Sequence, residues 1–494
     1  MEAEEMSVIS NEVGKRERTV NDWSARDMYF SLLSPSGFSK GRADSAGFLT
    51  AHLKETSQHL NNMPAHPEQL EAWLDEHTQV VGRQFQDYLA VRQEGGRRWY
   101  FSSKAHALYF LRAVAPTKMV DGAWLYGITR HWHDARFASL LKIYLEELGN
   151  GMEAMNHVVL YRKLLKVNEC EDSKNLDDKF FTQGALQLAL AANTETHVPE
   201  VIGFNLGYEQ LPLHLLITAY ELKELNIDPY YFTLHTTIDN AHSGHARAAI
   251  EAVSEAMPTF GSARRYMERI MAGVKLNDAG LGTLDIINHF DLHGEVIRVL
   301  QNKADIGRYM HSNRCVIEGK TMNEWLADPD QVAKLLYIMQ KTGWIKRHQD
   351  PEQSRFWQVI AAEKAPMFGV FTAYERQVIY DWIAGDVLEI LPRVARLGPP
   401  WRMAEHPMAQ REKQCGNVYD LRSGLRLAEL DLPDDDINQE QLSLERYLHG
   451  LGPKRMEFLI DWLSPAKHHT ALGLCATRYF KAYMDAPYSQ YSRT

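Results

Sequence analysis

Cysteine is scarce in this chain of 494 residues, and its four cysteines lie far apart. No two of them have the CxxC spacing of a zinc-binding knuckle, since they lie at Cys170, Cys315, Cys415 and Cys475. Their wide spacing also gives no disulfide framework of the kind that stabilises small secreted domains. The cysteine content therefore favours a reducing compartment, and we expect a cytoplasmic protein.

Long hydrophobic runs and an excess of positive charge are also missing. No stretch approaches the roughly 18 apolar residues of a transmembrane helix, so no membrane span is expected. The formal net charge is −10, which argues against general nucleic-acid binding because that function needs a basic surface. Residues 1–24 mix both charge signs without an apolar segment, so we expect a flexible tail rather than a secretory signal.

Alternation of apolar and polar residues, the pattern of half-buried strands, is rare in the first half of the chain. Residues 66–91 and 136–167 instead carry apolar residues at steps of three and four, which is typical of amphipathic helices. Ala115-Pro116 divides another helical stretch, because proline ends or kinks a helix. The predicted fold class is therefore mainly α, with an all-helical bundle domain over residues 25–257.

Residues 258–494 form a second predicted region that is mostly helical. Within it, residues 323–365 place a helix before two apolar segments, WIKRH and FWQVI, which flank the turn-rich QDPEQS. A helix followed by a hairpin resembles a winged-helix unit. Three roles fit this region: covering an active site, forming a homodimer, or binding a carrier or partner protein. The acidic net charge argues against DNA binding.

The strongest chemical signal is the segment HTTIDNAH, which contains His235, Asp239 and His242. Positions i, i+4 and i+7 lie on one face of an α-helix, so the three side chains would project together. Imidazole and carboxylate ligands suit iron, manganese or zinc. A metal site in a bundle needs further ligands from neighbouring helices. The polar character of the segment is equally compatible with a solvated helix face.

Candidate partners precede this helix. Glu147 and His157 are ten residues apart, which leaves them about 80° apart around a straight helix. Gly149 and Gly151 lie between them, and a bend there would bring both side chains to one cavity. Asp121 is a carboxylate in an apolar stretch, where burial would require a partner or a metal. The alternatives are that His157 is a core histidine, that Glu147 is an exposed acidic residue and that Asp121 is a helix N-cap.

Two further residues near these motifs are less distinctive. Glu209 lies in NLGYEQLPLHLL, a short distance before the His235 segment. Two roles fit Glu209 equally: accepting a hydrogen bond from a metal ligand, or a purely structural role. For His245, three residues after His242, exposure to solvent is expected in preference to contact with a metal ligand.

Three motifs in this order, DGAWLYG, EELGNGMEAMNH and DPYYFTLHTTIDNAHSGHA, resemble those of the haem-oxygenase-like di-iron oxidases and oxygenases, a family of iron-containing redox enzymes. The resemblance implies a seven-helix bundle that holds two irons per chain, as Fe(II) or Fe(III), in place of haem. It also implies dioxygen as co-substrate and a small substrate derived from an amino acid, an amine or a fatty acid. The reactions implied are N-oxygenation, desaturation and carbon–carbon cleavage.

The resemblance also assigns roles to residues. It implies that Glu147 bridges the two irons and that His157 binds one of them. Asp121 stands where the family usually has glutamate, one methylene longer. By the same resemblance, the remaining metal ligands are His235, Asp239 and His242.

Two other functional classes stay open on sequence grounds. One is a non-enzymatic helical scaffold that binds partners through its C-terminal region. The other is a cofactor-free helical oxidase of the quinone-cofactor-synthesis type, which shares the architecture but does not need the H-x₃-D-x₂-H spacing.

Overall fold

Helices provide almost all the regular structure of the described residues. The computed structural model describes residues 23–34, 38, 41–173, 175–238, 244–361, 365–367, 369–386 and 444–485. Two predicted metal ligands, Asp239 and His242, lie outside the described residues, as does Cys415.

The first part of the chain forms a helical core. Its α-helices are α1 (Ala25–Leu33), α3 (Arg42–Thr56), α4 (Leu70–Gln93), α5 (Lys104–Ala113), α6 (Ala115–Lys118), α7 (Ala138–Glu147), α8 (His157–Val167), α9 (Thr182–Ala192), α10 (Thr194–Tyr208), α11 (Leu213–Glu224), α12 (Tyr230–Ile238), α13 (His245–Glu255) and α14 (Ala263–Lys275). Short 3-10 helices connect them: η1 (Pro67–Gln69), η2 (Ala123–His131), η3 (Ala135–Phe137), η4 (Gly149–Gly151), η5 (Glu153–Met155), η6 (Asp178–Phe181) and η7 (Leu276–Asp278).

Two further helical groups follow the core. The first comprises α15 (Thr283–Asn288), α16 (Leu292–Gly307), α17 (Met322–Leu326), η8 (Pro329–Gln331), α18 (Val332–Lys341), η9 (Pro351–Gln353), α19 (Arg355–Ala361) and α20 (Ala373–Ala384). It includes a small antiparallel strand pair, β1 (Val316–Ile317) and β2 (Lys320–Thr321), in which Val316 is opposite Thr321. The second comprises η10 (Gly452–Lys454), α25 (Arg455–Trp462) and α26 (Ala471–Asp485).

The bundle extends beyond the boundary at residue 257 that the sequence suggested. Helix α14 buries Met267, Ile270 and Val274, whose spacing of three and four residues gives one apolar face, with Tyr266 beside it. This face packs closely on α10, because a Cβ at Gly203 would lie only 1.9 Å from the carbonyl oxygen of Ile270. Helix α14 is therefore part of the core.

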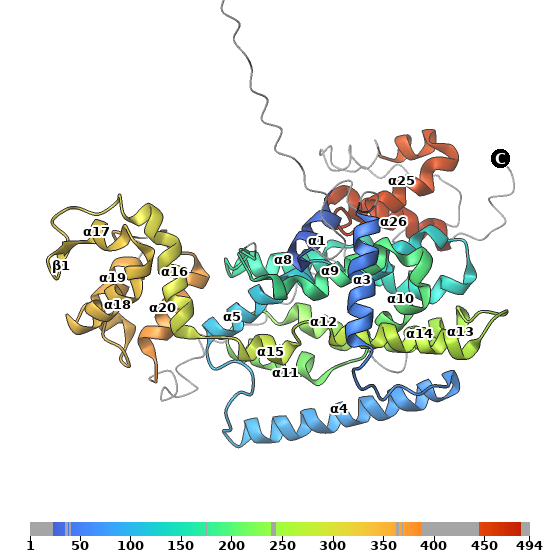
Figure 1. Cartoon of the computed structure of the whole chain (residues 1–494), viewed down its shortest axis with the longest axis horizontal. Coiled ribbons are helices and arrows are strands. Elements are labelled where there is room, and N and C mark those ends of the chain that lie inside the picture. Colours follow the sequence, from blue (N-terminus) through green and yellow to red (C-terminus); the bar gives the residue numbers. More distant parts are fainter. Residues whose placement is uncertain are drawn as a thin grey trace, which may run out of the picture.

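The two later groups contact the core at different places (Figure 1). Helices α16 to α20 lie to one side, and α25 and α26 cover another face. Asp381 of α20 accepts a hydrogen bond of 2.7 Å from the backbone N–H of Ala105 in α5. On the other face, the Tyr144 hydroxyl of α7 donates to the carbonyl oxygen of Leu463, directly after α25. Buried polar contacts thus attach both groups to the core.

The predicted hairpin of residues 323–365 is wrong. The segment FWQVI belongs to α19, where Phe356, Trp357 and Ile360 are buried. Positions i, i+1 and i+4 share a helix face, whereas alternate residues would share a strand face. The segment WIKRH makes isolated contacts instead of a ladder, such as the hydrogen bond from Phe356 N–H to the Trp344 carbonyl. The two strands of this group lie earlier, at residues 316–321.

The described helices include none that combines the length and the apolar character needed to cross a bilayer.

Candidate metal centre

Four ionisable side chains from separate elements meet in the core. Asp121 lies in the turn between α6 and η2, Glu147 is the last residue of α7, His157 is the first of α8, and His235 lies in α12. All four are buried, with exposures of 5% or less. Burial of so many ionisable groups is costly unless they pair with one another or bind a metal. The structure thus brings together four of the six predicted metal ligands.

The potential ligand atoms of these four residues all lie within 4.8 Å of one another. Glu147 Oε2 is 2.5 Å from His157 Nδ1, and Asp121 Oδ2 is 3.3 Å from His235 Nε2. The same Asp121 oxygen is 3.8 Å from His157 Nδ1. Two carboxylates and two imidazoles converging in this way form a ligand set that suits iron, manganese or zinc.

A break in the helix brings Glu147 and His157 together. Gly149, Asn150 and Gly151 all have positive φ angles, of 63°, 52° and 79°. Glycine and asparagine tolerate this left-handed backbone better than other residues do. The chain therefore turns sharply after α7 and enters α8 at His157.

A second glycine allows Asp121 to approach Glu147. Gly122 has φ of 77°, and a Cβ at this position would lie 2.8 Å from Glu147 Cβ. Since real Cβ atoms do not come so close, only glycine fits here without displacing Glu147. Gly122 thus sets the close approach of the Asp121 turn to the end of α7.

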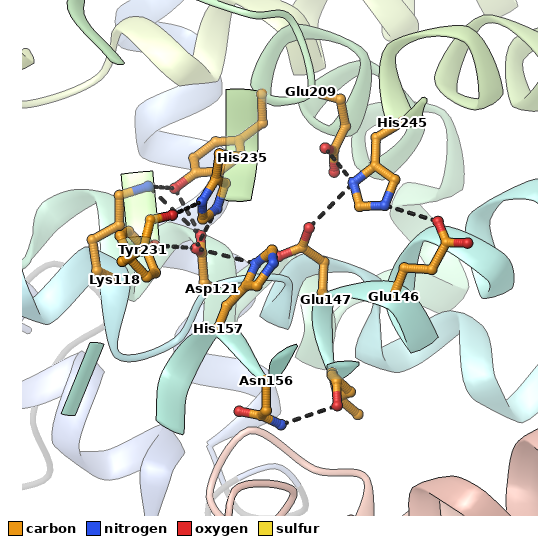
Figure 2. Close-up of polar contacts among 12 residues, drawn as sticks. Lys118, Asp121, Glu146, Glu147, Asn156, His157, Glu209, Tyr231, His235 and His245 are labelled. Atoms are coloured by element: carbon orange, nitrogen blue, oxygen red, sulfur yellow. Dashed lines mark hydrogen bonds and ion pairs between the residues drawn. The ribbon is translucent and has the colours of Figure 1, made fainter. Parts of the chain in front are cut away.

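A second group of potential ligands shares Glu147 with the first. His245 Nδ1 lies 3.1 Å from Glu209 Oε2 and 3.3 Å from Glu147 Oε1. The potential ligand atoms of Glu147, Glu209 and His245 are again within 4.8 Å of one another, and all three residues are buried. Figure 2 shows Glu147 between His157 and His245. Its two carboxylate oxygens therefore face different imidazoles.

Hydrogen bonds orient the imidazoles. His235 Nδ1 lies 2.8 Å from the carbonyl oxygen of Tyr231, and this contact leaves Nε2 to face Asp121 at 3.3 Å. His245 Nε2 lies 3.0 Å from a carboxylate oxygen of Glu146, which is partly exposed. This contact leaves His245 Nδ1 to face Glu147. Each ring thus presents one nitrogen to the cluster.

Asp121 also has hydrogen-bond and charge partners besides the histidines. The Tyr208 hydroxyl donates a hydrogen bond of 3.0 Å to Asp121 Oδ1, and the Tyr231 hydroxyl donates to Oδ2. Lys118 Nζ lies 3.8 Å from Asp121 Oδ1 and 3.0 Å from the Tyr208 hydroxyl. These contacts fix the carboxylate in one orientation.

The pKa shifts reflect burial and pairing. Burial raises the pKa of Asp121, but the charge of Lys118 and the hydrogen bond with His235 outweigh it and lower this pKa to about 2. Burial likewise opposes ionisation of Glu147, yet His157 and His245 hold its pKa well below the usual range. Burial lowers the pKa of His245, but Glu209, Glu146 and Glu147 outweigh it and raise this pKa well above 6.5. The pKa of His157 is raised too, because Glu147 outweighs burial.

These shifts predict that metal affinity rises with pH. A metal binds only the deprotonated imidazole, so the protons held by His157 and His245 must leave. Because the pKa values of both residues are raised, the increase should continue well above pH 6.5, by about tenfold per pH unit for each proton displaced. Competition titrations with a chelator at several pH values would measure this. An affinity that levels off near the ordinary histidine pKa of about 6.5 would contradict the prediction.

One further observation supports metal binding by these carboxylates and imidazoles. Glu209 Oε1 is buried and has no hydrogen-bond partner among the described residues. An unpaired buried carboxylate oxygen is costly, and a bound cation is one way in which such an atom is satisfied. The oxygen belongs to a residue of the second ligand group.

The sequence and the structure differ on two residues near the site. His245, expected to face solvent, is 2% exposed and contacts three carboxylates. Glu209 lies beside His245 as a potential ligand in its own right. Asp239 and His242 lie outside the described residues, so their role as ligands stays a prediction. The ligand roles of Asp121 and the other clustered residues also stay predictions, although the cluster itself is present.

Comparison with known families is consistent with this geometry. Residues 108–278 match the model of a family described as iron-containing redox enzymes. This confirms the resemblance inferred from the three motifs, and with it the haem-oxygenase-like fold. The match contains both ligand groups and reaches the end of η7. No curated protein and no solved structure matches the chain.

Proposed function

Residues 108–278 form a domain of the iron-containing redox enzyme family, and from this premise we propose that the protein is a non-haem di-iron oxidase or oxygenase that uses dioxygen. Its substrate is a small molecule derived from an amino acid, an amine or a fatty acid. The reaction is an N-oxygenation, a desaturation or a carbon–carbon cleavage, and the enzyme works in the cytoplasm. The family match supports iron as the metal. The arrangement of the side chains supports two iron ions per chain.

The position of Glu147 is the observation that carries the proposal. Its Oε2 faces His157 at 2.5 Å, and its Oε1 faces His245 at 3.3 Å. A carboxylate with one oxygen toward each of two ligand groups is suited to bridge two metal ions. Asp121, His157 and His235 would hold one ion with Glu147, while Glu209 and His245 would hold the other with it.

The surrounding side chains have roles of their own. Tyr208, Tyr231 and Lys118 hold Asp121 in place, and the Tyr231 carbonyl fixes the orientation of His235. Burial of the whole cluster excludes bulk water, which strengthens electrostatic interactions within it. Iron bound there would supply the redox chemistry with dioxygen. The protein contributes a rigid, dry and anionic ligand cage.

Metal stoichiometry and oxygen consumption test the proposal together. Metal-free full-length protein loaded with Fe(II) without oxygen should retain two iron ions per chain after desalting. Admission of oxygen with candidate amines, amino acids or fatty acids should then give substrate-dependent oxygen consumption. His235→Ala should lower the iron content, because His235 Nε2 faces Asp121. Absence of stoichiometric iron in the wild type would favour the scaffold, and oxygen consumption without metal would favour the cofactor-free oxidase.

A further inference from the structure

The loop that joins Glu147 to His157 is covered by the C-terminal helical group. A Cβ at Gly151 would lie 2.4 Å from the carbonyl oxygen of Leu474 in α26. Arg478, one turn further along α26, donates a hydrogen bond of 2.7 Å to the carbonyl oxygen of Gly151. Helix α26 therefore packs directly on the backbone of this loop, and the bonded residues, Gly151 and Arg478, are 327 positions apart in the chain.

Asn156 ties the two ends of the loop together from inside. Its Oδ1 accepts a hydrogen bond of 3.0 Å from Val159 N–H and so caps α8. This contact assigns the other terminal atom as the amide nitrogen, which donates to the carbonyl oxygen of Leu148 at 3.2 Å (Figure 2). Leu148 directly follows Glu147, and Asn156 directly precedes His157. One buried side chain thus connects the neighbours of both metal-facing residues.

The C-terminal group supplies the remaining partner of this asparagine. Asn156 Nδ2 lies 3.1 Å from His468 Nδ1. Since the amide nitrogen can only donate, His468 Nδ1 must accept. His468 is buried, and its backbone is held by α26, because a Cβ at Gly473 would lie 2.6 Å from His468 Cα. The imidazole is therefore a fixed part of the docked C-terminal group.

We propose that His468 and α26 are positioning elements of the metal centre, which hold the loop of residues 148–156 so that Glu147 and His157 face one another. The inference rests on the proposed function, since it assumes that these two residues bind metal. It assigns to residues 444–485 a role in metal binding at a site that they do not line. The core domain would then bind metal at full strength only with its C-terminal helices docked.

Three full-length variants separate positioning from general stability. His468→Leu removes the acceptor for Asn156, whereas His468→Asn places an amide oxygen about where Nδ1 lies. His469→Leu is the matched control, because His469 belongs to the same turn but bonds to the Pro465 carbonyl instead of the loop. Co(II) is the probe: titration gives its affinity, its visible absorption bands report the ligand geometry, and thermal unfolding of the metal-free protein reports stability.

We expect His468→Leu to weaken Co(II) binding about 10- to 100-fold, the range for groups that orient a metal ligand, and to shift the absorption bands. His468→Asn and His469→Leu should keep the wild-type affinity and spectrum. Arg478→Met, an exposed change on α26, should give a smaller loss in the same direction and serves if His468→Leu fails to fold. Two results would overturn the inference but leave the proposed function standing. One is wild-type affinity in both His468→Leu and Arg478→Met. The other is an equal loss of affinity in His468→Leu and His469→Leu. No Co(II) binding by the wild type would overturn the proposed function and the inference with it.

Discussion

Glu147→Gln is expected to abolish binding of both metal ions of the proposed di-iron centre. The amide keeps the shape of the side chain but removes the charge, and its nitrogen cannot serve as a ligand. Because Glu147 faces His157 with one oxygen and His245 with the other, both positions would lose an anionic ligand. We expect each affinity to fall by more than about 100-fold, beyond the range for residues that only contact a ligand.

Two matched variants divide the site into its halves. Asp121→Asn should remove the metal beside His157 and His235, since Asp121 belongs only to that group. Glu209→Gln should remove the metal beside His245 for the same reason. Each variant should therefore retain one metal ion per chain, whereas Glu147→Gln retains none. This pattern distinguishes a bridging carboxylate from two independent sites.

Metal analysis of desalted protein measures the pattern, with circular dichroism to show that each variant is folded. Glu146→Gln is the control, since Glu146 precedes Glu147 but contacts His245 Nε2 from the partly exposed side. It should keep both ions, with the affinity beside His245 lowered by about tenfold, the low end of the range for groups that orient a metal ligand. Retention of one ion by Glu147→Gln would show that Glu147 serves a single position.

The sequence predicted the residues of the first ligand group because each lies in a short stretch of sequence with a recognisable pattern. Glu147 and His157 are separated by a short segment with two glycines, and glycine pairs mark sites where a helix breaks. Asp121 was recognisable as a carboxylate in an apolar stretch. What the sequence could not provide is the environment of Asp121, because Tyr208 and Tyr231 meet it from separate, distant helices.

His245 was missed as a member of the second ligand group, for a reason that can be traced to one glycine. A continuous helix over residues 230–257 would turn His245 away from the face of His235. In the structure, Gly244 has an extended backbone and α13 begins anew at His245. The new helix direction turns His245 into the core toward Glu209. Gly244 was the available signal, since glycine often marks the end of a helical segment.

The contact of α26 with the loop of residues 148–156 was also beyond sequence reasoning. His468 and Asn156 are 312 residues apart, and neither helix periodicity nor motif spacing relates positions at that separation. The same holds for Arg478 and the Gly151 carbonyl. Local patterns identify helices and their buried faces, whereas the pairing of distant helices depends on how the complete core packs.

Gly122→Ala is expected to damage the metal centre without changing any ligand. The left-handed backbone at φ of 77° would cost an alanine about 1–2 kcal/mol. In addition, the new methyl group would lie 2.8 Å from Glu147 Cβ and 3.1 Å from its Cγ, and relief of such overpacking costs about 1–3 kcal/mol. Because the neighbour that must move is Glu147, the displacement acts on the carboxylate shared by both ligand groups. We expect both metal affinities to fall together.

Gly343→Ala supplies the control that separates backbone strain from this displacement. Gly343 has φ of 75°, and an added Cβ would meet nothing within 4 Å. Both variants should therefore lose about 1–2 kcal/mol of unfolding free energy from the backbone, measurable by urea denaturation of the metal-free proteins. Only Gly122→Ala should also lose metal affinity and the additional packing energy. Equal metal affinity in the two variants would mean that Glu147 tolerates the methyl group, and that its position is set by the loop after α7 instead of by the Asp121 turn.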